Sequence, residues 1–322
     1  MKPEFTRLFL LSILFVAQTV AHAQTWPSKP VRIIVSFTPG ASIDLAARAV
    51  GQRLADSLNQ PFVVENRPGG NTIVSAELAA KAPPDGYTLF MALDTTMTLV
   101  PAIYDKVPYD PVKDFAPVGQ INRGAYIIVA PAKAPYRNLA DMIAYAKSNP
   151  GKMNVGASTA FTQLLTVMLR SAAGVDITYV PYKGGPPMIQ ALLSGELDGT
   201  VDGIPLYVGL VKAGKVIPIV TTGPTRAVQF SDVPTIREAG YPQLEAPSWT
   251  AWFAPAGTPD PIVRRLNGEL AKILNNAEFK QKTLEGGQNP LVHASPEEVG
   301  EQVKQGLAKW GPLVKASGIK LD

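Results

Sequence analysis

Apolar residues follow two different spacings along this chain, and the two spacings alternate. Short runs of β-branched and aromatic residues predict buried strands, whereas longer segments with an apolar residue every three or four positions predict amphipathic helices. Because strands and helices alternate along the chain, the pattern predicts an α/β architecture with parallel sheets. Strands are expected at residues 31–36, 62–65, 87–93, 126–130, 153–156, 177–180, 199–201, 216–221 and 249–253, and helices at 45–58, 72–81, 139–148, 164–173, 186–195, 261–274 and 278–284.

A tight turn joins the first strand to the first helix. Pro39 and Gly40 are turn residues, and Ser42 or Asp44 can cap the helix that follows. A strand that turns directly into a helix points the unpaired N–H groups of that helix beyond the strand end, where α/β sheets bind anions. The turn is therefore a candidate anion site, with an ordinary strand–helix connection as the alternative.

The same arrangement recurs in the middle of the chain, which predicts a second α/β lobe. There a strand pattern at 153–156 leads through the turn 157–162 into a helix pattern at 164–173. A polar stretch at 94–98 and Asp202 each follow a further predicted strand. The neutral hydroxyl donors that these segments offer to a ligand are Thr95, Thr96, Ser158, Thr159 and Thr162. The final helix is marked by Ser295 as N-cap, with Glu298 at its third position.

The N-terminal residues are typical of a secretory signal peptide. An apolar run at 8–17 precedes Ala21-His22-Ala23, which has the small residues of a cleavage site, so residues 1–23 are expected to be removed and the protein to be periplasmic. The sequence has no Cys, which excludes thiolate metal sites and Cys nucleophiles, and no metal or cofactor is expected. The formal charge of +4 is spread over interspersed charges, so nucleic acid is not expected as a partner.

Several motifs occur in a fixed order along the whole chain after the signal peptide. They are KPVRIIV at 29–35, ENR at 65–67, PDGYTL at 84–89, PYDPVKDF at 108–115, VPYKG at 180–184, DVPT at 232–235 and APAGTP at 254–259. In this order they resemble the receptors of tripartite tricarboxylate transporters, the Bug proteins. The resemblance implies a type II periplasmic binding protein, with two α/β lobes and a ligand cleft between them.

Carried onto this sequence, the resemblance places residues 24–123 and 247–322 in lobe 1 and residues 124–246 in lobe 2. The crossovers then fall near 122–124 and 245–247. The implied function is that of a monomeric receptor, without enzymatic activity, that captures a small carboxylate. The ligand is expected to be an aromatic acid or a dicarboxylate, and the receptor would deliver it to the permease subunits of the transporter.

The family holds the ligand carboxylate between its two facing turns through backbone N–H groups, hydroxyls and water. The ligand-binding residues implied here are Phe37, Pro39, Gly40, Ala41, Ser42, Asp44, Thr95, Thr96, Ser158, Thr159, Ala160, Phe161, Thr162 and Asp202. Two positions depart from the family. Ala41 stands where a second Gly is usual, and Phe161 would either make the pocket more apolar or face the core of lobe 2. Asp44 and Asp202 would contact the ligand directly, contact it through water, or serve only as structural caps.

A secreted serine hydrolase is the alternative hypothesis. Residues 156–160 read Gly-Ala-Ser-Thr-Ala, which matches all but the last Gly of the nucleophile motif G-x-S-x-G. Asp202 and His293 follow Ser158 in the chain order of an α/β-hydrolase. This hypothesis requires His293 to contact Ser158 in the folded protein.

Overall fold

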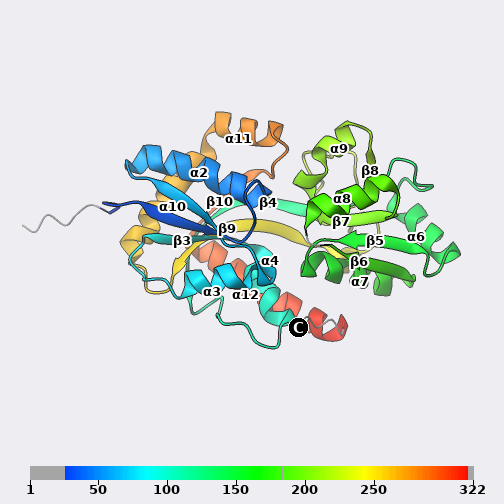
Figure 1. The fold of residues 1–322 in the computed structure, drawn as a ribbon, viewed down its shortest axis with the longest axis horizontal. Helices are drawn as coiled ribbons and strands as arrows, with labels where there is room; N and C mark the ends of the chain where they lie inside the picture. The colour runs from blue at the N-terminus through cyan, green and yellow to red at the C-terminus, as the bar shows by residue number, and fades with distance from the viewer. Residues whose placement is uncertain (1–25, 183, 318–322) are drawn as a thin grey trace, which may run out of the picture.

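The computed structural model describes residues 26–182 and 184–317. The predicted signal peptide and its cleavage site lie outside these residues. The described chain forms two α/β halves that lie side by side along the long axis of the molecule (Figure 1). Within the described ranges, no helix combines the length and the apolar character that a membrane span requires.

The first half contains parallel strands next to antiparallel ones. Strands β1, β2 and β3 are parallel, β9 pairs antiparallel with β3, β4 pairs antiparallel with β9, and the short β10 pairs antiparallel with β4. The bounds are β1 Val31–Val35, β2 Phe62–Asn66, β3 Thr88–Leu93, β4 Phe115–Pro131, β9 Pro247–Pro255 and β10 Leu291–Ala294. The sequence did not predict β10, because its four residues carry no strong period.

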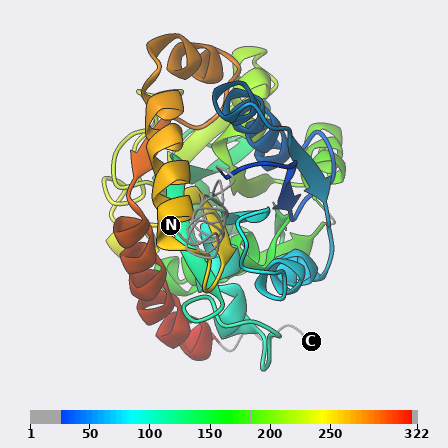
Figure 2. The same ribbon diagram turned by 90° about the vertical axis from the view of Figure 1, so that its left-hand side faces the viewer.

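Helices cover both faces of this sheet, as the end-on view shows (Figure 2). Alternate residues of β1 and β3 bury their side chains against α2, α10 and α11 on one face and against α3 and α12 on the other. The bounds are α2 Ser42–Leu58, α3 Ile73–Ala80, α10 Asp260–Asn275, α11 Ala277–Glu285 and α12 Pro296–Ser317, with the short helices α4 Asp94–Thr98, α5 Val100–Ile103 and η1 Gly70–Thr72. Residues 94–98, predicted as a polar turn, therefore form a helix.

The second half repeats this layered arrangement. Strands β5, β6 and β7 are parallel, and β7 and β8 both pair antiparallel with the second part of β4. The strands are β5 Met153–Ala157, β6 Ile177–Pro181, β7 Gly199–Gly203 and β8 Val216–Thr221. The helices are α6 Leu139–Ser148, α7 Ala160–Ala173, α8 Gly185–Ser194 and α9 Val208–Lys212, with short η2 Ile204–Leu206 and η3 Pro242–Leu244.

Strand β4 runs without a break through both halves. The strand expected at 126–130 is too short, because residues 115–125 pair with β9 before residues 126–131 pair with β7 and β8. The crossover near 122–124 stays a prediction. Pro117 and Gly124 argue against a central strand by sequence. The structure accommodates them through two register shifts and through the Asn289 side chain, which fills the space beside Gly124. The assignment of residues 124–246 to one lobe stays a prediction.

The directions of the strands bring the carboxyl ends of the parallel strands in the two halves to face each other. Strand β3 runs in the same direction as β4, since both are antiparallel to β9, whereas β7 runs against β4. Leu93 at the end of β3 lies level with Asn122 of β4, and Gly203 at the end of β7 lies level with Tyr126. Four residues of a strand span about 13 Å. The carboxyl ends of the parallel strands therefore point toward the same short section of β4 from opposite directions.

Candidate functional site

Helix α2 starts directly after the first turn, and no side chain caps it. Its N-cap residue is Ala41, which has an extended backbone and offers no side-chain oxygen. The prediction that Ser42 or Asp44 caps the helix is therefore wrong, because both residues already lie in its first turn. The N–H groups of Ser42 and Ile43 find no acceptor within the described part of the chain.

Asp44 fixes the shape of this first turn. Its carboxylate is only 1% exposed and accepts hydrogen bonds from the backbone N–H of Gly40 (2.9 Å), from Asn66 Nδ2 (2.8 Å) and from Arg48 Nε (3.1 Å). Burial alone would raise the pKa of Asp44, but these hydrogen bonds and the Arg48 charge outweigh burial and hold the pKa below its usual value. Gly40 has a φ of 85°, a conformation that favours glycine.

Helix α7 starts after the second turn with a side-chain cap. The hydroxyl oxygen of Thr159 accepts from the N–H of Thr162 (3.2 Å), and the N–H groups of Ser158 and Thr159 donate to the Thr162 hydroxyl (3.1 Å each). This is a capping box built from two threonines. The N–H groups of Ala160 and Phe161 still find no acceptor among the residues that the structure describes. The N–H of Asp44 also has no acceptor among the described residues, so the first turn presents three consecutive free N–H groups and the second presents two.

Ser158 and Asp202 lie together at the carboxyl ends of β5 and β7. The Ser158 hydroxyl donates to one carboxylate oxygen of Asp202, and the N–H of Gly203 donates to the other (2.7 Å). Burial raises the pKa of Asp202, while the hydrogen bonds from Ser158 and Gly203 partly oppose that rise. Asp202 is therefore easier to protonate than a solvated aspartate, in contrast to Asp44.

Phe161 faces the core. Its side chain is 1% exposed, and the centre of its ring lies 4.6 Å from the ring centre of Tyr126 and 5.0 Å from that of Trp310. Of the two orientations left open for this residue, the structure has the core-facing one, so only its backbone N–H is available to a ligand. The Thr96 side chain is likewise fully buried, whereas Thr95 is partly exposed.

Two residues that sequence reasoning did not select support the first turn. Asn66 donates to Asp44 and to the carbonyl of Phe37 (2.9 Å), and Gln288 accepts from the Ser42 hydroxyl (2.5 Å). The Gln288 carbonyl also accepts from Gln229 Nε2 (2.9 Å), a residue of the other half. Asn66 lies within the ENR motif at 65–67, which could have indicated it. No local signal marks Gln288, because its contacts join distant parts of the chain.

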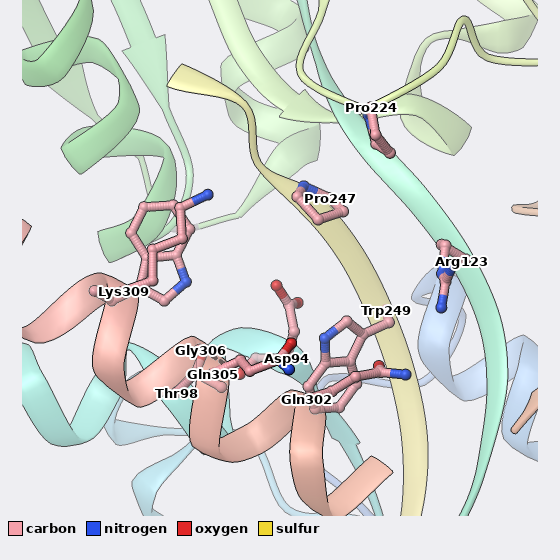
Figure 3. Close-up of a pocket in the computed structure, with 11 residues that line it drawn as sticks. Asp94, Thr98, Arg123, Pro224, Pro247, Trp249, Gln302, Gln305, Gly306 and Lys309 are labelled. Carbon is pink, nitrogen blue, oxygen red and sulfur yellow. Dashed lines mark hydrogen bonds between the residues drawn. The ribbon is translucent and has the colours of Figure 1, made fainter. Parts of the chain in front are cut away.

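A pocket of about 240 Å³ lies where α12 passes the two strands that connect the halves (Figure 3). Asp94 at the start of α4 is buried in its wall. That burial raises the pKa of the Asp94 carboxyl to about 7, opposed by the backbone N–H groups of Thr95 and Trp249. The lining residues are Asp94, Thr98, Arg123, Pro224, Pro247, Trp249, Gln302, Gln305, Gly306, Lys309 and Trp310. None of the predicted ligand-binding residues is among them.

The hydrolase arrangement is not assembled. Ser158 donates its hydroxyl hydrogen directly to Asp202, while His293 lies on β10 beside β4. Among the described residues, no hydrogen bond joins His293 to Ser158 or Asp202, and its Nε2 has no partner. The contact between nucleophile and base that a serine hydrolase requires is therefore absent from this part of the chain.

Two α/β halves with facing strand ends define the class of periplasmic solute-binding proteins, and solved structures agree. The R. palustris protein Rpa4515, solved with adipate, is 35% identical with a TM-score of 0.84, over 92% of this chain and 99% of that one. MatC from Rhodopseudomonas palustris, solved with bound malate, is 30% identical with a TM-score of 0.79, over 90% of this chain and 100% of that one.

The family is defined by sequence. The model of the tripartite tricarboxylate transporter family receptor matches residues 46–319. Protein BugT of Bordetella pertussis is 30% identical over 329 residues, which cover 99% of each chain. The chain belongs to this receptor family, the Bug proteins, whose members are periplasmic solute-binding proteins.

Proposed function

We propose that this protein is a periplasmic receptor that captures a small dicarboxylate between its two strand–turn–helix turns. One observation carries the proposal: α2 and α7 each begin with two consecutive backbone N–H groups that no acceptor occupies, at Ser42 and Ile43 and at Ala160 and Phe161. Helix N-termini of this kind attract anions through unpaired N–H groups and the helix dipole. The relatives solved with adipate and malate support a dicarboxylate.

The free N–H groups are sufficient for useful affinity. A hydrogen bond to a charged group contributes about 1.5–3 kcal/mol, and each helix dipole adds roughly 0.3–2 kcal/mol. Four such bonds and two helix ends can give a Kd near 1 μM, about −8 kcal/mol, after the cost of association. No lysine or arginine of the turns is needed to hold the carboxylate.

Titration calorimetry with adipate, malate and the neutral diamide of adipate tests the proposal. The acids are expected to bind, and the diamide to bind far more weakly, because it brings no negative charge to the helix ends. Benzoate distinguishes an aromatic acid from a dicarboxylate. Equal affinities for adipate and its diamide would exclude an anion site at these helices.

A proline substitution removes one N–H donor without unwinding the helix. Ala160 is the first residue of α7, where proline is well tolerated, and Thr159 before it has the extended backbone that proline requires. Ala160→Pro should weaken acid binding about tenfold to a hundredfold. Ala277→Pro is the matched control, because Ala277 is the first residue of α11 and also follows an extended N-cap residue. Unchanged binding by Ala160→Pro contradicts a role for this N–H group.

The proposed receptor delivers its ligand to the membrane permease subunits of a tripartite tricarboxylate-type transporter. Family membership supports this role. Export by cleavage after Ala23 follows from the same proposal. Mass spectrometry of the periplasmic protein should find Gln24 at the N-terminus, and an intact Met1 would contradict export through this segment.

A further inference from the structure

The pocket beside α12 contains polar atoms that lack partners. Asp94 is 3% exposed, and its Oδ1 has no hydrogen-bond partner among the described residues. Gln302 Oε1, from α12, also has no partner within the described ranges. A buried acceptor that stays unpaired costs free energy, so such atoms mark places where a donor from outside the chain is missing.

No cation of residues 26–182 or 184–317 pairs with Asp94. Within the described residues Asp94 forms no ion pair, and only backbone N–H groups, those of Thr95 and Trp249 among them, stabilise its charge. Lys309 lines the same pocket, but its Nζ donates to the Glu245 carbonyl (2.6 Å) and lies 4.7 Å above the centre of the Trp310 ring. Arg123 is exposed at the other side of the pocket.

Aromatic rings complete the surroundings of the carboxylate. Trp249 of β9 and Trp310 of α12 are both largely buried and both line the pocket. Figure 3 shows the Asp94 carboxylate projecting into the space between Trp249 and Lys309. An indole face attracts a cation, and a buried carboxylate with a free oxygen requires an N–H or O–H donor.

We propose that this pocket is a second binding site, for the ammonium group of a small primary amine. The ammonium N–H groups would donate to Asp94 Oδ1 and Gln302 Oε1, and the indole rings of Trp249 and Trp310 would cover its short apolar tail. Arg123 and Lys309 carry positive charge at the pocket edges and disfavour a second cationic group on the ligand. The ligand class is therefore a monovalent amine.

The amine site is separate from the proposed carboxylate site. None of the residues of the turns at 37–44 and 158–162 lines the pocket. The Trp310 ring packs edge-on against Phe161, the second residue of α7, but no residue proposed to bind the amine belongs to either turn. Failure of carboxylate binding therefore leaves the amine site testable on its own.

The indole N–H signals of the full protein report directly on this site. The chain has four tryptophans, of which Trp249 and Trp310 line the pocket, while Trp26 and Trp252 serve as internal references. The probe is butylammonium at pH 8, where Asp94 is largely ionised and the amine is protonated. Butylammonium should shift the Trp249 and Trp310 signals saturably and leave the references in place. Butan-1-ol, a neutral probe of the same length, should bind at least tenfold more weakly.

Asp94→Asn removes the charge and keeps the shape of the side chain. Butylammonium affinity should fall at least tenfold, while affinity for adipate stays within twofold. Asp56→Asn, at an exposed position of α2, is the control and should change neither. The proposal is overturned if the pocket signals do not saturate, which means that only water occupies the pocket. It is also overturned if butan-1-ol binds equally well, or if Asp94→Asn keeps its amine affinity.

Discussion

Both strand–turn–helix turns leave the first two N–H groups of their helix free, but different side chains hold the two turns in place. The first turn depends on Asp44, a buried and ionised carboxylate with Arg48 and Asn66 as donors, and its helix has no side-chain cap. The second depends on the hydroxyls of Thr159 and Thr162, and its helix has a capping box. One local geometry can therefore be reached through charge or through neutral hydrogen bonds.

The pKa shifts of the nearby aspartates follow this difference. The donors around Asp44 hold its pKa below the ordinary value despite burial. Burial raises the pKa of Asp202 because only Ser158 and Gly203 donate to it, and neither carries a charge. The first turn should thus lose stability when the Asp44 charge is removed, and the second when the hydroxyls of Thr159 and Thr162 are removed.

Asp44→Ala should have the largest effect. It leaves the N–H of Gly40, the amide of Asn66 and the Arg48 guanidinium without their acceptor, so the free energy of unfolding should fall by about 3 kcal/mol. Urea denaturation measures the loss. Asp56→Ala, on the exposed side of the same helix, should change stability by less than about 0.5 kcal/mol. A loss for Asp44→Ala no larger than that of the control would break the contrast between the turns.

The pH dependence of two asparagine variants should have opposite signs. The folded-state pKa of Asp44 is lowered, so its contribution to stability is present above the ordinary aspartate pKa of 3.8 and is lost as pH falls through the folded pKa. The folded-state pKa of Asp202 is raised, so its contribution is present below 3.8 and is lost as pH rises through the folded pKa.

Urea denaturation of both variants at pH 3 and pH 7 measures this difference. Relative to the wild type, Asp44→Asn should lose more stability at pH 7 than at pH 3. The free energy of unfolding of Asp202→Asn, relative to that of the wild type, should be higher at pH 7 than at pH 3. If stability relative to the wild type changed equally between pH 3 and pH 7 in both variants, the two carboxylates would share one environment.

Thr159→Ala should cost about 1 kcal/mol, because it removes the N-cap oxygen of α7. Ser295→Ala is a matched comparison, since Ser295 Oγ accepts from the N–H of Glu298 (3.1 Å) in the capping box of α12. The two losses, measured by thermal unfolding, should be similar. Only Thr159→Ala should also weaken adipate binding. A loss of binding in both variants would point to general destabilisation.

Ala41→Ser should have the smallest effect on stability, and in the opposite direction. A serine at the N-cap position can accept from the N–H of Ile43 or Asp44, which adds about 0.5 kcal/mol to the stability of a helix that has no side-chain cap. The same hydroxyl competes with the ligand carboxylate, so adipate affinity should fall several-fold. Increased stability with unchanged affinity would show that the N–H of Ile43 does not bind ligand.

Local sequence signals predicted helix boundaries accurately where a nearby side chain accepts a hydrogen bond from a backbone N–H group at the helix end. The helix predicted at 139–148 has those bounds, because Asn138 accepts from the N–H of Asp141 (2.9 Å). The N-cap role of Ser295 is confirmed for the same reason. The helix predicted from 164 instead begins at Ala160, since the two threonines of its capping box were interpreted as turn residues.

Long-range contacts decided what the sequence did not predict. Strand β4 extends back to Phe115 because β9 and β10 supply its hydrogen-bond partners, although Pro117 and Gly124 argue against a strand locally. The orientation of Phe161 was left open by sequence. It was settled by Tyr126 and Trp310, whose rings come from the long connecting strand and from the last helix.

The sequence by itself determined the alternation of strands and helices, the two turns and the family, because periodicity, caps and motif order are local properties. Only the tertiary structure decided that Asp44 is an ionised support, that Ser158 is bonded to Asp202, and that Asp94 is buried at a pocket. The physical reason is that burial and hydrogen-bond partners set the charge and the role of a carboxylate, and those partners lie far away in the chain.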